Sequence, residues 1–185
     1  MKKDLLRRRI KASKAILDEA DRARAAEAVF SKLEATAAFL MADRILAYFS
    51  LPDELSTREF IDRWSSRKHF FLPRVNGVNL DILPYDRTTL RLGAFQIEEP
   101  QGDDTADVND MELIIVPGVA YDRACNRLGR GKGFYDRLLA TSRATKIGVA
   151  YDCQFVDEID VDEHDIPVDI VITESGIYRR PKRDK

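Results

Sequence analysis

The chain has 185 residues, and its 30 Lys and Arg residues nearly balance 32 Asp and Glu residues, which gives a formal net charge of −2. This balance provides no global attraction to nucleic acid or to membrane surfaces. Two cysteines are too few for a disulfide framework, and the sequence contains no apolar run long enough to span a bilayer. We therefore expect a cytoplasmic protein that folds as a single domain over residues 1–185. We also expect a monomer, although none of these features determines the oligomeric state.

The first helix is predicted over residues 1–17, where Leu6, Ile10 and Leu17 form one apolar stripe. The basic residues around this stripe, taken alone, are typical of a solvated charged face. A second helix is predicted over residues 20–40. Its buried edge is expected to consist of Ala25, Val29, Leu33 and Leu40.

The first strand is predicted over residues 44–50, and a turn follows it. Glu54 lies between the end of this strand and the next helix, which is where open α/β sheets bind their ligands. An ordinary loop carboxylate explains Glu54 equally well. Ser56 begins the pattern Ser-Thr-Arg-Glu, which has the form of a capping box, so we expect Ser56 to be the N-cap of the next helix.

Two further strands are predicted over residues 70–75 and 80–85, joined by a short hairpin turn. The segment 92–100 follows. From its composition we expect a loop that is packed by the side chains of Phe95 and Ile97.

A buried strand is predicted over residues 113–116, and a glycine-rich loop with interleaved cations follows at residues 129–133. A helix pattern begins directly after this loop. Glycines let backbone N–H groups approach an anion closely, and a helix N-terminus adds partial positive charge. Because the glycines alternate at every second position, the pattern is neither the dinucleotide fingerprint nor the P-loop. The spacing alone therefore leaves both a phosphate-binding loop and a flexible turn open.

Strands are also predicted over residues 146–151 and 168–173, so strands alternate with helices along the chain. This alternation predicts an α/β fold with three layers, α/β/α, and a mainly parallel central sheet. A zinc site is not expected, since neither His69 nor His164 has potential ligands at a suitable spacing.

Asp136 lies one helical turn after Lys132 and has two explanations from the residues alone. One is an i,i+4 ion pair with Lys132, which stabilises a helix by only about 0.2–0.5 kcal/mol. The other is a metal site, because Mg²⁺ is usually held by one or two carboxylates together with phosphate and water.

The motifs Val-Pro-Gly-Val-Ala-Tyr-Asp and Asn-Arg-Leu-Gly-Arg-Gly-Lys-Gly-Phe-Tyr-Asp, within residues 116–136, closely resemble the signature of the 5-formyltetrahydrofolate cyclo-ligase family. The run Lys-Asp-Leu-Leu-Arg at residues 3–7 looks like the family's N-terminal Lys-x-x-Leu-Arg element. Residues 92–100 resemble a family segment that lies near the substrate pocket. Two positions depart from the pattern, because Ser56 stands where the family has an acidic residue and Phe134 where it often has tyrosine.

The resemblance implies an ATP- and Mg²⁺-dependent ligase. It would cyclise 5-formyltetrahydrofolate to 5,10-methenyltetrahydrofolate through an imidate phosphate and release ADP and phosphate. The implied catalytic residues are Lys132 and Arg130, and the implied metal ligands are Asp136 and Asp165. The implied ATP site consists of Lys3, Arg7, Arg127, Leu128, Gly129, Arg130, Gly131, Lys132, Gly133, Phe134 and Tyr135. The implied substrate site consists of Arg7, Leu51, Glu54, Ser56, Arg130, Lys132 and Phe134.

Two other functions stay open from the sequence. One is an isomerase or transferase of the same architecture that acts on sugar phosphates or CoA thioesters, since fold does not decide function. The other is a non-catalytic folate- or nucleotide-binding module. The presence of Asp136 and Lys132 argues against such a module, because it would not need a metal site.

Overall fold

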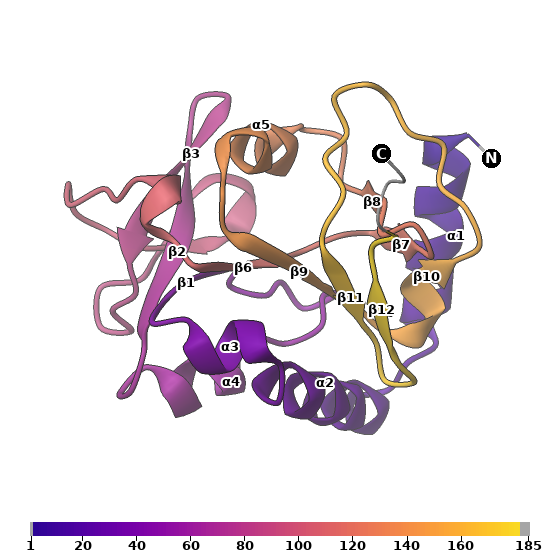
Figure 1. Ribbon diagram of the computed structural model, residues 1–185, viewed down its shortest axis with the longest axis horizontal. Coiled ribbons are helices and arrows are strands. Elements are labelled where there is room, and N and C mark those ends of the chain that lie inside the picture. Colours follow the sequence, from indigo (N-terminus) through magenta and orange to yellow (C-terminus); the bar gives the residue numbers. More distant parts are fainter. Residues whose placement is uncertain (1, 182–185) are drawn as a thin grey trace.

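The computed structural model describes residues 2–181, and within this range seven strands form one central sheet (Figure 1). These strands are β1 (Arg44–Ala47), β2 (His69–Asn76), β3 (Asn79–Pro84), β6 (Leu113–Val116), β9 (Thr145–Val149), β11 (Ile170–Ile172) and β12 (Ile177–Arg179). Their order in the sheet is β12-β11-β9-β6-β1-β2-β3. The inner strands run parallel, and only the outermost pair at each edge is antiparallel.

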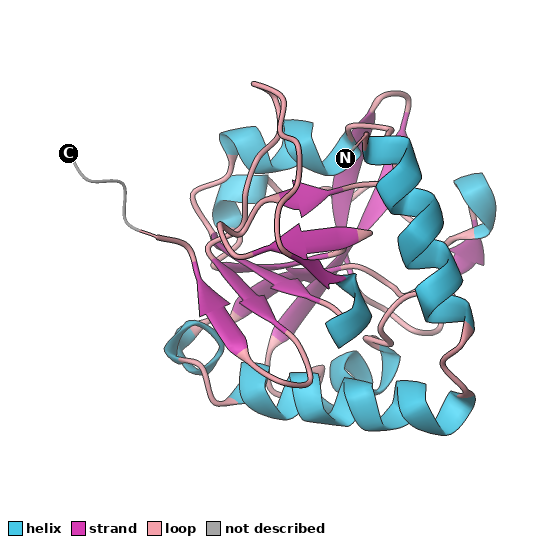
Figure 2. Ribbon diagram, turned by 90° about the vertical axis from the view of Figure 1, so that its right-hand side faces the viewer, coloured by secondary structure: helices cyan, strands magenta, loops and turns pink. Residues whose placement is uncertain are grey.

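Helices cover both faces of this sheet, which confirms the predicted three-layer α/β/α fold (Figures 1 and 2). One face carries α2 (Glu19–Glu34), α3 (Ala37–Met41) and α4 (Arg58–Trp64), and the other carries α5 (Phe134–Thr141). Neighbouring residues of a strand point to opposite faces. Ile115 therefore lies in the same core as Val29 and Phe60 from α2 and α4, whereas Ile114 lies in a second core with Leu139 of α5.

The first helix, α1 (Lys3–Ala15), stands at one end of the sheet instead of on either face (Figure 1). It packs against a small sheet formed by β10 (Phe155–Val156), β7 (Ala120–Asp122) and β8 (Arg127–Leu128). Leu6 and Ile10 of the predicted apolar stripe are buried there against Ala120, Leu128 and Ile159. These short strands lack a periodic pattern long enough to be predicted from the sequence.

The prediction of one helix over residues 20–40 is wrong, because the segment forms the two helices α2 and α3. The break occurs at Thr36, whose hydroxyl accepts a hydrogen bond from the Phe39 N–H at 3.2 Å and so caps α3. The new helix axis buries Phe39 and leaves Leu40, the expected core residue, 64% exposed. The other three residues of the predicted edge are buried.

The prediction of Ser56 as an N-cap is also wrong. Ser56 is exposed, and α4 begins after Thr57, which is fully buried. The Thr57 hydroxyl donates to the carbonyl oxygen of Tyr48 at 2.7 Å and accepts from the Ser50 N–H at 3.3 Å. These bonds connect the start of α4 to the segment that follows β1. The strand β1 itself ends at Ala47, three residues before the predicted end at residue 50.

The predicted hairpin is confirmed, since β2 and β3 pair in antiparallel register. Residues 91–99 contain a further two-stranded pairing of β4 (Arg91–Leu92) with β5 (Glu98–Glu99). The expected packing of Phe95 is wrong: its side chain is 58% exposed, and its backbone has a left-handed φ of 57°. The remaining elements are the 3-10 turns η1 (Ala94–Gln96), η2 (Val108–Asp110) and η3 (Asp152–Gln154).

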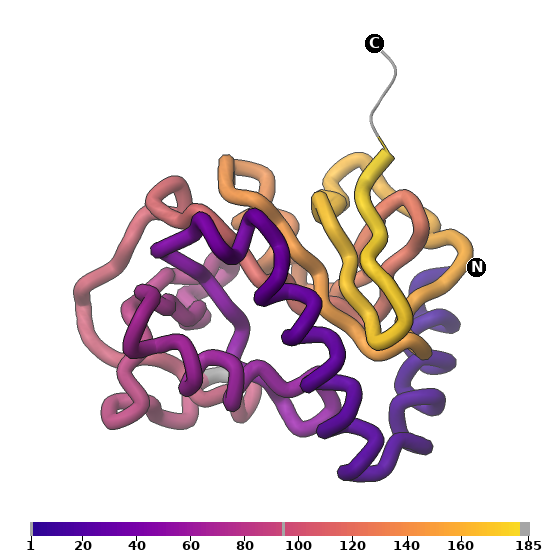
Figure 3. The backbone as a smooth tube through the Cα atoms, turned by 60° about the horizontal axis from the view of Figure 1, so that its bottom comes forward, coloured from indigo at the N-terminus to yellow at the C-terminus, as the bar shows by residue number. Residues whose placement is uncertain are grey.

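The sheet ends at β12, which was not predicted and which pairs with β11 (Figure 3). The strand predicted over residues 168–173 is confirmed by β11, which lies parallel to β9. Within the described chain, none of the helices combines the length and the apolar character that crossing a membrane requires.

Tyr121 lies against Gly148, and this contact leaves no room for a side chain at the glycine. A Cβ atom at Gly148 would lie 2.4 Å from Cε1 of the fully buried Tyr121 ring, whose hydroxyl donates to the carbonyl oxygen of Val116 at 2.7 Å. We expect Gly148→Ala to lower the free energy of unfolding by about 1–3 kcal/mol through overpacking. Urea denaturation measures this change. A wild-type unfolding midpoint would mean that the ring can move without cost.

Candidate active site

A cavity of about 1050 Å³ opens at the carboxyl ends of β1 and β6, two neighbouring strands in the middle of the sheet. Its lining includes Tyr48 and Phe49, which follow β1, and Pro117 and Gly118, which follow β6. From β1 the chain continues to β2 on one side, whereas from β6 it continues to β9 on the other side. Open α/β sheets bind ligands in the crevice that such a divergence creates. The volume reaches the upper end of the range for one small ligand.

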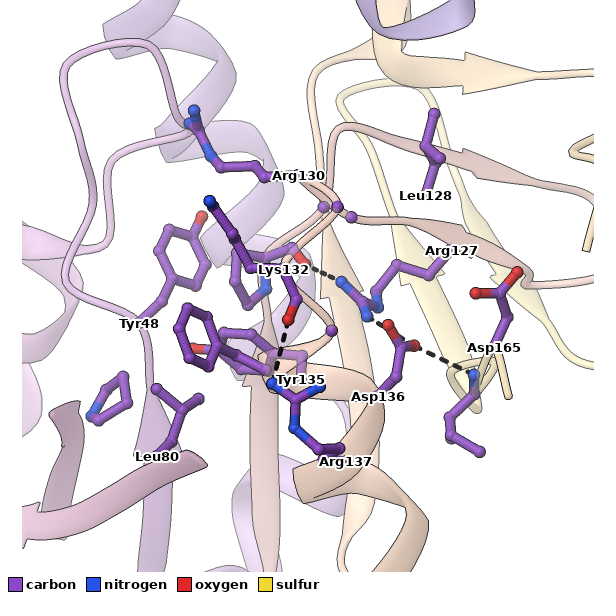
Figure 4. A pocket seen from close by; sticks show the side chains of 18 of the residues that line it. Tyr48, Leu80, Arg127, Leu128, Arg130, Lys132, Tyr135, Asp136, Arg137 and Asp165 are labelled. Carbon is purple, nitrogen blue, oxygen red and sulfur yellow. Dashed lines mark hydrogen bonds and ion pairs between the residues drawn. The ribbon is translucent and has the colours of Figure 1, made fainter. Parts of the chain in front are cut away.

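The cavity brings together all but one of the site residues predicted from the sequence, and several of them are labelled in Figure 4. Those on its lining are Lys3, Arg7, Leu51, Glu54, Arg127, Leu128, Gly129, Arg130, Gly131, Lys132, Gly133, Phe134, Tyr135, Asp136 and Asp165. Ser56 is the exception, because it is exposed and lies outside the lining. The predicted residues thus surround one space, although they come from both ends of the sequence.

The glycine loop follows β8 and leads into α5, and two of its glycines have left-handed backbone angles. Gly131 has a φ of 94°, and Gly133, the N-cap of α5, has a φ of 69°. Residues other than glycine rarely adopt such backbone angles, which explains why glycine occupies these two positions of the alternating pattern. The loop is also held from outside, since Arg7 Nε donates to the carbonyl oxygen of Gly129 at 2.9 Å. The loop is therefore tied to α1 and is not an isolated turn.

Arg127 and Asp136 form an ion pair in the cavity wall (Figure 4). Arg127 Nη2 donates to Asp136 Oδ1 at 2.8 Å, and the Arg127 side chain is only 3% exposed. Asp136 Oδ1 also accepts from the Ile166 N–H at 3.2 Å. The partner of Asp136 is thus Arg127 and not Lys132, which lies before the N-cap of α5 and therefore outside the helix that would give it an i,i+4 position.

The basic face of α1 reaches into the same cavity. Lys3 Nζ donates to Oδ2 of Asp162 and Oδ2 of Asp165, both at 2.5 Å. Burial by itself would lower the pKa of Lys3, but its hydrogen bonds to these two aspartates raise the pKa above its usual value. Lys3 and Arg7 are half-buried at the site, while the other basic residues Arg8, Arg9 and Lys11 are exposed, as expected for a solvated face.

The carboxylates Asp136 and Asp165 fit a magnesium site that a ligand phosphate would complete. Among residues 2–181, no group of three or more His, Cys, Asp or Glu side chains is arranged to enclose a metal ion. Mg²⁺ commonly needs only one or two carboxylates when phosphate oxygens and waters fill the other positions. Both hydrogen bonds to Asp136 from the described residues fall on Oδ1, which leaves Oδ2 for such a cation.

Asp165 is already partnered in this structure. Its Oδ2 accepts from the Asp162 N–H at 2.8 Å as well as from Lys3. Burial would raise the pKa of Asp165, but these two hydrogen bonds lower it below its usual value, so the carboxylate is charged at neutral pH. A cation at Asp165 would therefore have to share this carboxylate with Lys3.

Glu54 faces the glycine loop across the cavity and is not an ordinary solvated carboxylate. Its side chain is 15% exposed, and its Oε1 accepts from Arg130 Nη2 at 3.1 Å. Its Oε2 accepts from the Leu51 N–H at 3.0 Å, which fixes the turn after β1. This turn therefore lies opposite the loop and carries both an apolar residue and a carboxylate to the cavity.

One wall of the cavity is apolar and consists of Tyr48, Pro73, Val75, Leu80, Phe95 and Ile97. Phe95 and Ile97 belong to the segment 92–100, which was expected near the substrate pocket, whereas the other four residues were not predicted at the site. The signal that could have found part of it is the two-residue period of the hairpin, since Pro73 and Val75 share a face of β2. Burial raises the pKa of the Tyr48 hydroxyl, so Tyr48 stays neutral and contributes an aromatic surface.

Arg137 was also missed. Its Nε donates to the carbonyl oxygen of Val78 at 2.9 Å, and its Nη2 donates to the carbonyl oxygen of Lys132 at 3.0 Å. It therefore links the glycine loop to the tip of the β2–β3 hairpin. Arg137 lies four residues after Gly133, on the same side of α5, and this spacing could have indicated that its side chain reaches the glycine loop.

Comparisons with known proteins agree with this geometry. The sequence model of the 5-formyltetrahydrofolate cyclo-ligase family matches residues 1–174. The chain is similar to the 5-formyltetrahydrofolate cyclo-ligase of Escherichia coli (strain K12), with 34% identity over 149 residues that cover 75% of this chain and 82% of that protein. The mouse (Mus musculus) enzyme of the same name is 31% identical over 150 residues, which cover 72% and 74%.

A solved structure extends the similarity to the whole fold. The NMR structure of Aquifex aeolicus 5,10-methenyltetrahydrofolate synthetase superposes with a TM-score of 0.90 at 34% sequence identity. The match covers 100% of this chain and 96% of that one. The known structure thus contains the same helices and strands that surround the cavity in this chain.

Proposed function

The chain belongs to the 5-formyltetrahydrofolate cyclo-ligase family, and we propose that it uses ATP to close 5-formyltetrahydrofolate to 5,10-methenyltetrahydrofolate in the cavity between β1 and β6. The observation that carries this proposal is the cationic glycine loop lying beside an apolar wall in one space. The loop suits a triphosphate, and the apolar wall suits the flat ring of a folate. Because residues from Lys3 to Ile166 of one chain line this space, we propose that a single-domain monomer holds the whole site.

In the proposed reaction, the formyl oxygen on N5 attacks the γ-phosphorus of ATP, ADP leaves, and an imidate phosphate forms. N10 then adds to the activated formyl carbon and loses its proton, and inorganic phosphate leaves to give the methenyl product. The chain does not have to supply a nucleophile for either step. Its contribution is to position two substrates and to neutralise the charge that develops on the transferred phosphoryl group.

Each substrate has its own set of residues in this proposal. Lys132 and Arg130, as the catalytic residues, donate to oxygens of the transferred group, and the backbone N–H groups of residues 129–133 hold the phosphates. Glu54 and Leu51 contact the folate across the cavity. Ser56 is left out of the folate site, since its side chain is exposed outside the lining.

Magnesium fits the same arrangement. Asp136, with Asp165 beside it on the lining, would hold the ion, which when bound neutralises charge on the phosphate oxygens. Arg127 supports this site by fixing the Asp136 carboxylate through Oδ1.

The proposal is tested by mixing the protein with 5-formyltetrahydrofolate, ATP and Mg²⁺ and following the absorbance of the methenyl product. We expect product to form only when all three are present, with one ADP released per product. A matched reaction with a non-hydrolysable ATP analogue should give none.

The outcomes separate the remaining candidates. Product formation without ATP would contradict the ligase chemistry. Binding of ATP and folate in calorimetry without any turnover would instead indicate a non-catalytic binding module. Family membership already argues against a sugar-phosphate isomerase or a CoA transferase.

A further inference from the structure

Asp53 lies between a lysine of α1 and an arginine of the glycine loop. Its Oδ2 accepts a hydrogen bond from Lys14 Nζ at 2.8 Å, and its Oδ1 accepts one from Arg130 Nη2 at 2.8 Å. Asp53 itself is not among the residues that line the cavity, whereas Arg130 is. The Asp53 carboxylate therefore contacts the cavity lining through its hydrogen bond to Arg130.

Lys14 fixes the Asp53 carboxylate from the side away from the cavity. The Lys14 side chain is 6% exposed, and its Nζ also donates to the carbonyl oxygen of Asp53 at 2.7 Å. A buried ammonium needs a charged partner, because removing it from water is costly. Arg22 strengthens the anchor, since it donates to the carbonyl oxygens of Lys14 at 2.6 Å and Pro52 at 3.4 Å.

Arg130, by contrast, is half exposed and is held by one of its three nitrogens. Its Nη2 donates to Asp53 and Glu54, and within residues 2–181 its Nη1 and Nε donate no hydrogen bond. Burial would raise the pKa of Asp53, but hydrogen bonds from Lys14 and Arg130 lower it below its usual value. The carboxylate is therefore charged at neutral pH and binds the guanidinium as an ion pair.

We propose that Asp53 is a positioning residue for ring closure, which holds Arg130 at the cavity by Nη2 and leaves Nη1 and Nε for phosphate oxygens. This inference rests on the proposed function, because that function gives Arg130 a phosphate partner. A free arginine side chain loses conformational entropy when it binds a ligand, and an arginine that is already held loses less. Glu54 is assigned to the folate, so Asp53 is the carboxylate that stays with Arg130 when both substrates are bound.

A double-mutant cycle tests this role. Asp53→Asn is made in the wild-type protein and in an Arg130→Ala background, and kcat/KM for ATP and the calorimetric Kd of Mg²⁺–ATP are measured in all four proteins. We expect Asp53→Asn to lower kcat/KM about tenfold in the wild type and less than about twofold in the Arg130→Ala background, because Asp53 acts through Arg130. The Kd should follow the same pattern, so the cycle does not depend on residual turnover of Arg130→Ala.

Structural effects are separated by two further variants. In both backgrounds of the cycle, Asp53→Asn leaves Lys14 without its charged partner. We therefore expect the substitution to lower the thermal stability by the same amount in the wild type and in Arg130→Ala. If Asp53→Asn does not fold, the pair Lys14→Met with Asp53→Asn removes the unpaired buried charge and replaces it in the cycle. Asp62→Asn breaks a comparable ion pair, with Arg87, away from the cavity and should leave kcat/KM unchanged.

The outcomes are distinct. An equal loss of kcat/KM in both backgrounds, or no loss in the wild type, would overturn the positioning role while leaving the proposed function intact. A wild-type protein that neither binds ATP nor turns over would overturn the proposed function and this role with it.

Discussion

Replacing Lys132 by alanine is expected to lower kcat/KM for ring closure by about 100- to 1,000-fold, the usual effect of removing one preorganised donor from a transition state. Lys132 lies in the glycine loop on the cavity lining, and it is exposed. Its Nζ donates no hydrogen bond to any other described residue and lies 5.6 Å from the centre of the Phe95 ring. It is therefore free to donate to a phosphoryl oxygen.

The same substitution should barely change folding. Replacing an exposed side chain that makes no structural contact usually changes the free energy of unfolding by less than about 0.5 kcal/mol. Steady-state kinetics and urea denaturation of the same preparation measure the two effects. Lys11→Ala is the matched control, since Lys11 is exposed on α1 outside the cavity and should change neither quantity. Wild-type turnover in Lys132→Ala would remove Lys132 from the mechanism.

Replacing Asp136 by asparagine is expected to have two large effects. The first is a loss of about 3–5 kcal/mol in the free energy of unfolding, because the buried Arg127 guanidinium keeps its charge and loses its partner. The second is a rise of at least about tenfold in the Mg²⁺ concentration needed for half-maximal activity, since a carboxylate offered to the ion is lost. Denaturation and a Mg²⁺ titration below the unfolding temperature measure them.

A second substitution separates these two effects. Arg127→Met combined with Asp136→Asn removes the unpaired buried charge, so it should recover much of the lost stability. The Mg²⁺ response should stay impaired in this double variant. If the Mg²⁺ titration of Asp136→Asn matched the wild type, the metal would have to be held elsewhere. If its unfolding midpoint matched the wild type, the ion pair with Arg127 would not be stabilising.

The sequence predicted those features that depend on residues close together in the chain. The four apolar residues from Leu113 to Val116 predicted a buried central strand, and local composition predicted the glycine loop and the start of α5. The resemblance to a family brought the distant Lys3 and Arg7 to the same site. These predictions required no knowledge of how strands pair.

The predictions failed where the partner of a side chain is set by how strands, turns and helices pack together and not by the spacing within one helix. Asp136 was considered with Lys132, four residues away, yet it pairs with Arg127, which lies in β8 of the small sheet. Thr57 replaced Ser56 as the N-cap residue because its hydroxyl bonds to Tyr48 near the end of β1. The bridge from Lys14 through Asp53 to Arg130 joins three segments, and no local pattern marks it.

The pairing of cations in the cavity has a consequence for selectivity. In this structure, Lys3, Arg7, Arg127 and Arg130 each already contact a carboxylate of the chain. A simple anion such as sulfate can reach Lys132 and the Nη1 and Nε atoms of Arg130, but to bind the paired nitrogens as well it must displace internal carboxylates to which it offers nothing. A ligand pair brings phosphate oxygens for the cations and a metal ion or ring N–H donors for any carboxylate that it displaces, so no charge is left unpaired, and Asp53 can stay with Arg130. Discrimination against common cellular anions can thus arise from competition inside the protein.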